Sequence, residues 1–216
     1  MRIITARQTR PFESVADLAR RAALSTTELQ VLAAAGALHS LAGHRRQACW
    51  AAAGSEAAPG LLREAPIPDP MPSLPSPGET QEVIADYARL GFSLGRHPLS
   101  FLRGLLREER FLSAAEIAAC PDRKLARAAG IVTCRQRPAT ASGVLFVTLE
   151  DETGFVNLVV WSDIVERNRR PILGSRLLAV GGQVQKEGLV VHVLARQFED
   201  LSGLLGELRT TSHDFH

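Results

Sequence analysis

Hydrophobic and polar residues alternate along two short stretches in the last third of the chain, residues 144–149 and 155–161. A β-strand points successive side chains to opposite faces, so each stretch has two different sides. One side is aliphatic and comprises Leu145, Val147, Leu149, Val156, Leu158 and Val160. The other is mixed and comprises Phe146, Thr148, Phe155, Asn157, Val159 and Trp161. With the turn-like Asp151–Gly154 between them, the pattern predicts a β-hairpin whose aliphatic side is buried.

Similar patterns around this hairpin predict three more strands. They cover Gly130–Arg137, Arg176–Gln185 and Leu189–Phe198, and Lys186–Gly188 joins the last two. A helix over Ser162–Leu173, capped by Ser162, is predicted between the third and fourth strands. Five strands with one helix in this place have the order of an OB-fold barrel. An SH3-like barrel and an open sandwich are alternatives that usually lack the helix. The pair Gly181–Gly182 predicts a bulge or a barrel corner.

The first zone of the chain has helical periodicity. Ser14 is a predicted N-cap, and Ser25 with Glu28 has the capping-box spacing of a second helix that stops at Gly36. A third helix is expected over about Ala42–Ala53, with Arg45, Arg46 and Gln47 on one side and Cys49 and Trp50 packing on the other.

The expected fold class is α+β. A helical module at 1–58 is followed by a Pro-rich linker at 59–78, which contains seven prolines and cannot be a helix or a central strand. A helical connector is expected at 79–125, the OB domain at 126–203 and a flexible C-terminal tail at 204–216.

Composition then narrows the function classes. The 216 residues are 45% hydrophobic and carry a net charge of +2, so a polybasic binding mode for the whole chain is excluded. Cys49, Cys120 and Cys134 are widely spaced without a CxxC pair, which predicts free thiols and no zinc site. The sequence has neither a signal peptide nor a membrane-spanning stretch, so we expect a soluble, cytoplasmic protein with no membrane partner.

The mixed side of the hairpin is the candidate binding surface. OB barrels bind through the outer face of strands two and three, where an exposed aromatic ring can stack on a base. We expect Phe146, Thr148 and Asn157 to contact nucleic acid, and Arg135 and Arg137, beside the loop at 138–143, to hold phosphates. The alternatives are that Phe146 packs under another element, Asn157 is a solvated strand residue and the arginines are ordinary edge charges. For Trp161, burial beside the helix is the favoured interpretation.

No other group of residues in the sequence indicates a catalytic or metal-binding site. The run Glu150–Glu152 could attract a divalent cation, but such a run is more typical of a solvated hairpin tip. His97 has no nucleophile or acid placed to form a relay, and the common nucleotide, hydrolase and zinc-protease motifs are absent. We therefore predict no catalytic residue, no metal ligand and no cofactor in this chain.

Several short motifs resemble those of bacterial C-family DNA polymerases. Arg10–Leu18, Leu32–Leu38 and Arg45–Trp50 resemble the region that follows the fingers. A second group resembles the connector: Glu79-Thr80, Asp86-Tyr87, Leu90–Leu94 and His97–Leu99. A third group resembles the error-prone alpha-subunit paralogue used in damage-induced mutagenesis: Gly130–Pro138, Thr140–Gly143, Phe146–Gly154 and the ending Ser212–His216. The chain thus resembles a C-terminal fragment of that polymerase family.

The resemblance implies translesion synthesis and DNA repair in the SOS response. The implied partners are single-stranded or primer-template DNA, the remainder of the polymerase, other mutagenesis proteins and the sliding clamp, although no clamp-binding peptide ends the chain. The PHP domain, palm, thumb and fingers would lie outside this chain, so Mg²⁺ is expected only for the full polymerase. The helix-hairpin-helix element is expected to be absent except for its last turn, Arg2–Arg10. The hairpin is also similar to anticodon-binding OB domains of class II aminoacyl-tRNA synthetases, in which the positions matching Phe146 and Asn157 face nucleic acid.

A different function class remains open. The near-neutral charge also favours a protein-docking module of the mutagenesis machinery that makes no direct DNA contact. A stand-alone enzyme is disfavoured, because no set of carboxylates can be assembled to hold the metal ions of phosphoryl transfer.

Overall fold

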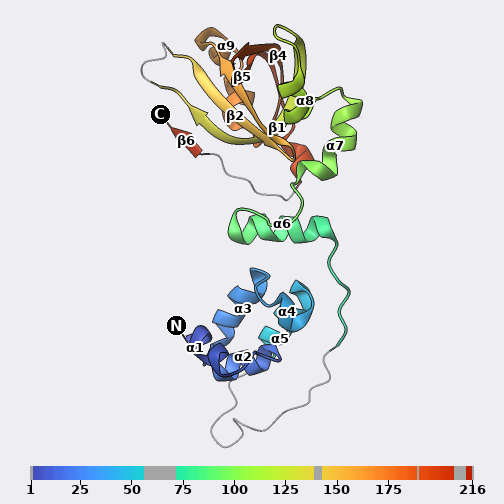
Figure 1. Cartoon of the computed structure of the whole chain (residues 1–216), viewed down its shortest axis with the longest axis vertical. Coiled ribbons are helices and arrows are strands. Elements are labelled where there is room, and N and C mark those ends of the chain that lie inside the picture. Colours follow the sequence, from blue (N-terminus) through green and yellow to red (C-terminus); the bar gives the residue numbers. More distant parts are fainter. Residues whose placement is uncertain (1, 56–71, 139–142, 189, 207–212, 216) are drawn as a thin grey trace, which may run out of the picture. The chain divides into compact units, whose positions relative to one another are not determined.

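Two compact units, Met1–Leu90 and Gly91–His216, make up the chain in the computed structural model (Figure 1). The structure describes residues 2–55, 72–138, 143–188, 190–206 and 213–215. Each unit has its own hydrophobic core. Most of the Pro-rich linker lies outside the described residues.

The first unit is built from short helices. They are α1 (Arg2–Thr9), α2 (Val15–Arg21), α3 (Thr26–Ala34), α4 (His39–Ala42), α5 (Arg45–Ala53) and α6 (Glu79–Leu90). The predicted caps are confirmed: the Ser14 hydroxyl accepts from the Asp17 N–H, and Ser25 and Glu28 form a reciprocal capping box. These caps satisfy N–H groups that have no partner within their helices.

Small residues allow these helices to pack closely. Leu29 and Ala33 of α3 and Ala48 and Ala52 of α5 are completely buried. The expectation that Trp50 packs inward is wrong, because its side chain is mostly exposed. Alanine at both 48 and 52 defines the buried stripe of α5, and Trp50 lies between these positions on another face.

Arg45 links α5 to α6. From the sequence, the residues of α6 were expected to belong to the connector at 79–125. The Nε of Arg45 lies 3.0 Å from the Glu82 carboxylate, and its guanidinium also bonds Asp86. Gln47 holds the end of the linker, since its amide donates to the Pro72 carbonyl and its Oε1 accepts from the Leu74 N–H.

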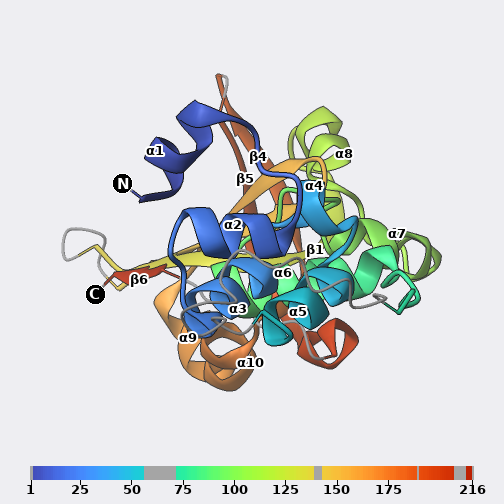
Figure 2. The same ribbon diagram turned by 90° about the horizontal axis from the view of Figure 1, so that it is seen from below.

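The second unit begins with α7 (Leu99–Glu108) and α8 (Ala114–Ala119) and continues as a β-barrel. Its five main strands are β1 (Leu125–Gln136), β2 (Leu145–Asp151), β3 (Gly154–Val160), β4 (Leu177–Glu187) and β5 (Val190–Asp200). They pair in the order β2-β3-β5-β4-β1, and the pairing of β1 with β2 closes the barrel. All these pairs are antiparallel except β3 with β5. The paired strands β4 and β5 run side by side in both views (Figures 1 and 2).

The barrel interior confirms the predicted hairpin pattern. All six aliphatic residues of the predicted inner side are at most 6% exposed, and they belong to one core with residues of β4, β5 and the helices. Because the interior takes alternate residues, the mixed side of β2 and β3 must face outward. The predicted OB fold is confirmed.

The segment between β3 and β4 differs from expectation. The single helix predicted over Ser162–Leu173 is two helices, α9 (Ser162–Arg167) and α10 (Arg169–Gly174). Ser162 is not the cap: Trp161 is the N-cap residue and makes no side-chain cap bond. At the C-terminal end of the chain, the structure has a 3₁₀ turn at Ser202–Leu205 and a short strand, β6 (His213–Phe215), that pairs in parallel with β1. Of the helices in the described part of the chain, none is long and apolar enough to cross a membrane.

Gly182 marks a bulge between β4 and β5, as the sequence predicted. The register shifts between Gly181 and Gly182, and the two strands approach so closely that a Cβ on Gly182 would lie 2.3 Å from the Leu194 carbonyl oxygen. A backbone atom cannot rotate away, so a larger residue here forces the strands apart.

We therefore expect Gly182→Ala to lower the free energy of unfolding by about 1–3 kcal/mol, the usual cost of overpacking. Gly104→Ala in α7 is the matched control, because no neighbouring atom lies within 4 Å and alanine favours a helix. It should leave stability unchanged or raise it by up to about 1 kcal/mol. Chemical denaturation of both variants measures this, and equal effects would contradict the close approach.

Candidate nucleic-acid interface

The outer face of β2 and β3 presents aromatic and amide side chains. Cross-strand pairs place Phe146 opposite Val159, Thr148 opposite Asn157, and Glu150 opposite Phe155. Phe155 is 62% exposed, Asn157 is also exposed, and Phe146 and Thr148 are half-buried. The Thr148 hydroxyl donates to the Asn157 Oδ1 at 3.3 Å, which leaves the Asn157 NH₂ group pointing away from this bond.

Trp161 continues this face beyond the end of β3. We expected it to be buried, but its side chain is 54% exposed. The helix that follows, α9, packs inward through Val165, which is completely buried. Its packing therefore does not depend on the indole ring of Trp161. Phe155 on β3 and Trp161 directly after its end are therefore both exposed.

The polar part of this face extends across β5 and β4, which the sequence interpretation missed. His192 pairs with Asn157 on one side and with Gln185 on the other, so Thr148, Asn157, His192 and Gln185 form a row across four strands. The signal was present in the sequence, because Val193 and Ala195 alternate with His192 and Leu194 and are buried. The same parity argument applied to β5 places His192 on the outer face.

Arg135 does not belong to this surface. It is 6% exposed, its Nε donates to the Ile172 carbonyl at 2.8 Å, and its Nη2 donates to the Ser175 carbonyl. The prediction that Arg135 holds phosphate is therefore wrong: its guanidinium satisfies backbone oxygens at the end of α10. Arg137 follows β1 and is exposed, as expected for a surface cation. Residues 139–142 of the adjoining loop lie outside the described residues.

The acidic run at the hairpin turn is an anchor rather than a solvated tip. Asp151 is buried, and its Oδ2 accepts from the Arg103 Nη2 at 2.9 Å and from the Ala114 N–H at 2.8 Å. Its Oδ1 accepts from the N–H and hydroxyl of Thr153, both at 2.7 Å. Glu152 accepts from the same arginine. One carboxylate thus ties the turn to α7 and α8, and the interpretation as a solvated tip is wrong.

Burial and charge shift the pKa values around this anchor. Burial alone would raise the pKa of Glu152, but the Arg103 hydrogen bonds bring that pKa below its ordinary value. Burial raises the pKa of Glu150, and the Asp151 charge adds to this. Burial lowers the pKa of His97, whose Nε2 lies 3.9 Å from a Glu150 oxygen. His97 Nδ1 accepts from the Leu99 N–H, so it helps to begin α7.

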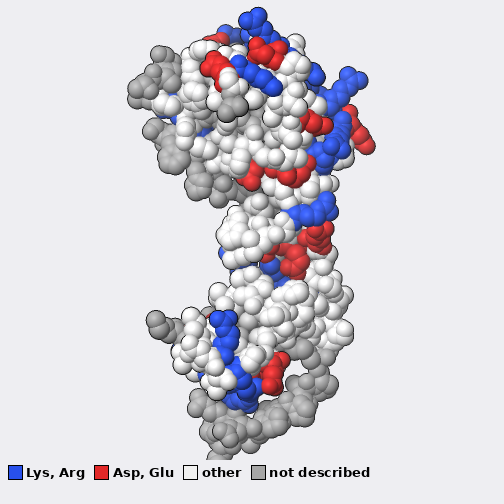
Figure 3. All heavy atoms as spheres, viewed as in Figure 1, with Lys and Arg blue, Asp and Glu red and all other residues white. Residues whose placement is uncertain are grey.

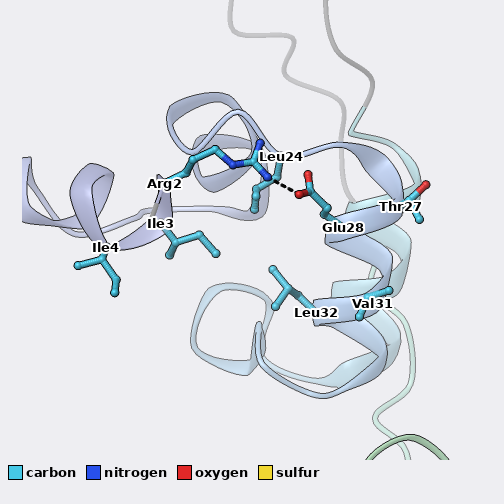
Figure 4. Close-up of a pocket in the computed structure, with 8 residues that line it drawn as sticks. All are labelled: Arg2, Ile3, Ile4, Leu24, Thr27, Glu28, Val31 and Leu32. Atoms are coloured by element: carbon cyan, nitrogen blue, oxygen red, sulfur yellow. Dashed lines mark hydrogen bonds and ion pairs between the residues drawn. The ribbon is translucent and has the colours of Figure 1, made fainter.

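The described part of the chain contains no cluster of three or more metal-binding side chains, and its three cysteines are free thiols. A hollow of about 660 Å³ lies between α1 and α3 in the first unit (Figure 4). Its walls are mostly aliphatic, and its two charged side chains, Arg2 and Glu28, pair with each other. The hollow therefore has no group free for acid–base work.

Comparison with known families agrees with both units. Residues 1–48 match a helix-hairpin-helix motif, and residues 127–201 match an OB-fold nucleic acid binding domain. The prediction that the helix-hairpin-helix element is absent except for Arg2–Arg10 is therefore wrong. The match begins at the first residue and runs through α4 into α5.

Relatives cover the whole chain. It is 58% identical over 215 residues to the error-prone DNA polymerase of Aromatoleum aromaticum, which covers 100% of this chain and 20% of the relative. It is 56% identical over 216 residues to that of an Azoarcus species, with the same coverage. The chain is homologous to part of the error-prone DNA polymerases. It spans about a fifth of the length of these polymerases, as a C-terminal fragment would.

Solved structures align with part of the chain. Asparaginyl-tRNA synthetase from Pyrococcus horikoshii has a TM-score of 0.37 at 23% identity, and the alignment covers 42% of this chain and 22% of the synthetase.

The Asp151 anchor can be tested by removing its charge. Asp151→Asn leaves Arg103 with the Glu152 carboxylate but without that of Asp151, and we expect the free energy of unfolding to fall by about 1–3 kcal/mol, the cost of a buried polar group that loses a partner. Asp163→Asn is the control, because Asp163 makes an exposed pair with Arg167 that is worth at most about 0.5 kcal/mol. Urea denaturation distinguishes the two, and similar losses would refute the anchoring role.

The anchor also predicts a pH dependence. The pKa of Glu152 is lower in the folded chain than in the unfolded chain, so its contribution is complete above the unfolded value of about 4.5 and is lost as the pH falls through the folded value. Arg103→Gln removes the partner that lowers this pKa. The stability gap between wild type and Arg103→Gln should therefore be largest near neutral pH and should narrow below about pH 4.5. A gap independent of pH would contradict the coupling.

Proposed function

We propose that this chain binds single-stranded DNA through the outer face of β2 and β3 and presents template during translesion synthesis. The observation that carries the proposal is the pair of exposed aromatic rings, Phe155 on the outer face of β3 and Trp161 directly after the end of that strand. The match of the barrel to an OB-fold nucleic acid binding domain supports it. So does the similarity of the whole chain to error-prone DNA polymerases.

The spacing of the rings suits unpaired bases. Phe155 and Trp161 are six residues apart, which is about 20 Å along an extended strand. Phe146 lies between them, opposite Val159. Each ring offers a face on which a base can stack, and the row of Thr148, Asn157, His192 and Gln185 offers donors and acceptors to base edges. In a duplex the faces of the bases are already stacked on one another, so this surface favours single strands.

The charges of the outward residues favour contact of this face with bases rather than with phosphates. The described outward residues of β2 and β3 include no lysine or arginine, and Glu150 is acidic. Arg137, just after β1, is the cation that the sequence assigns to this surface. We therefore expect binding through this face to depend only weakly on salt.

The wider role follows from the relatives. In an error-prone polymerase, this part would guide damaged template while the remainder carries out Mg²⁺-dependent nucleotidyl transfer in DNA repair and the SOS response. The remainder of the polymerase would be its first partner, with the sliding clamp and other mutagenesis proteins as further partners. A protein-docking role for the same face is the second candidate, and the absence of cations there favours it.

The stacking role predicts a specific loss. We expect Phe155→Ala and Trp161→Ala each to weaken binding of labelled oligo-dT by about tenfold, because a stacked base contributes about 1–3 kcal/mol. Fluorescence anisotropy at low salt measures this. Leu94→Ala is the control, since Leu94 is a large exposed apolar residue that precedes α7 rather than lying on β2 or β3. Unchanged binding in a variant that carries both Phe155→Ala and Trp161→Ala would reject the DNA-binding face and leave protein docking as the role of this surface.

A further inference from the structure

A row of polar side chains crosses the outer face of the barrel beside the exposed ring of Phe155. It comprises Thr148 of β2, Asn157 of β3, His192 of β5 and Gln185 of β4, each paired with the next. Neighbouring strands lie about 4.8 Å apart, and two residues along a strand span about 7 Å. A base stacked on the Phe155 ring therefore has Asn157 and His192 beside it, whereas Gln185 is two strands away.

A hydrogen bond within this row decides which way the Asn157 amide faces. The Thr148 hydroxyl donates to Asn157 Oδ1 at 3.3 Å, so the oxygen of the amide is turned toward β2. The NH₂ group of Asn157 has no partner among the described residues, and the side chain is exposed. Asn157 therefore offers its amide hydrogens to a ligand rather than its oxygen.

His192 presents a second donor next to this amide. Its Nδ1 is buried and has no hydrogen-bond partner in the described part of the chain, so Nε2 is the nitrogen through which the ring can meet a ligand. A neutral imidazole carries one N–H, and a buried N–H without an acceptor is rarer than a buried acceptor without a donor. We therefore place the hydrogen on Nε2. A protonated ring also donates from this atom.

The flanking polar groups are directed elsewhere. The NH₂ group of Gln185 donates to Glu187 at 3.1 Å, away from the ring on β3. Glu150, the acidic residue of this face, lies 3.9 Å from the Nε2 of His97. The groups nearest to a stacked base are thus two N–H donors on adjacent strands.

Two donors separated by about one strand spacing fit one kind of base edge. The Watson–Crick edge of thymine has a carbonyl oxygen at each end, O2 and O4, with N3–H between them. Cytosine has an amino group in the place of O4, and adenine and guanine also carry amino groups. An amino group placed against a protein donor leaves both donors without an acceptor, which costs affinity.

We propose that Asn157 and His192 make the barrel face prefer thymine-rich single strands to cytosine-rich ones. Thr148 is the positioning residue, because its hydroxyl fixes the Asn157 amide. This inference rests on the proposed function, since it names the bases that the barrel face takes.

The preference is to be separated from stacking and from charge. Aromatic rings stack on every base with modest differences, and phosphates are the same in every sequence. In the view of Figure 3, lysine and arginine side chains lie among acidic ones over the second unit rather than in one continuous strip. The test therefore compares two pyrimidine oligonucleotides of equal length and charge, and it changes the donors while the rings stay in place.

Fluorescence anisotropy of the whole chain with labelled oligo-dT and oligo-dC measures the ratio of the two affinities. We expect oligo-dT to bind the wild type about fivefold more tightly, the effect of about one hydrogen bond. Asn157→Asp keeps the shape of the side chain but replaces its NH₂ group with an oxygen that accepts from the cytosine amino group. The added charge lowers both affinities, and the ratio should reverse in favour of oligo-dC.

Three further variants identify the groups responsible. Gln197→Glu makes the same change of amide to acid at another exposed position of β5, which pairs with Gly181 outside the row, and it should leave the ratio unchanged. Thr148→Val removes the hydroxyl that orients the amide, so the ratio should fall to within about twofold of one without reversing. His192→Phe keeps an aromatic ring but removes the donor, and the ratio should fall to a similar extent.

Equal binding of the two oligonucleotides by the wild type would overturn the preference. So would a ratio that Asn157→Asp leaves unchanged, or one that Gln197→Glu shifts by as much. Failure of the proposed function gives a different result: neither oligonucleotide binds, or binding does not depend on Phe155 and Trp161, and the preference is then rejected with it. Equal binding that still requires both rings rejects the preference alone and leaves the proposed function standing.

Discussion

Closure of the barrel is the constraint on which the arrangement of the second unit depends. The pairing of β1 with β2 leaves one interior, and that interior is filled by the aliphatic residues of alternate positions. Burial of apolar surface stabilises the fold at about 25 cal/mol per Å², and a shift of register by one residue would bring the other side inward. The exposed positions of Phe155 and Asn157 are therefore consequences of where Val156 and Leu158 must lie.

Buried charges fix the parts that the aliphatic core does not reach. Arg103 and Asp151 join α7, α8 and the hairpin turn, and Arg135 closes the end of α10 through backbone carbonyls. Removing such groups from water is costly, so each is stable only because several partners surround it. These interactions specify how helices attach to the barrel. In the first unit, the buried Asp17 does the same for the segment between α1 and α2, because Arg10, Arg20 and Arg21 converge on its carboxylate.

Structural elements that depend on residues close together in the chain could be predicted from the sequence. The hairpin follows from a period of two, and the helix starts at Ser14 and Ser25 follow from cap chemistry, because both act within a few residues. Arg135, Asp151 and Trp161 could not be placed in this way. Their environments depend on Ile172, Arg103 and Val165, which lie between 4 and 48 residues away, and on which side of a helix meets the barrel. From the sequence alone, a charged residue in a strand is predicted to lie at the surface. Its burial can be recognised only when the carbonyl groups that surround it are known. Parity would also have found His192, had it been applied to β5 as well as to the hairpin.

The short strand β6 has a consequence for how the barrel ends. β1 pairs with β4 only through residues 125–131, so the backbone of 134–136 has β2 on one side and would be open on the other. β6 occupies that side, with Cys134, Arg135 and Gln136 paired in parallel to residues 213–215. An open edge is a template on which a strand from another molecule can add. The chain thus covers this edge with its own backbone, and the same three positions are where a foreign strand would have to compete.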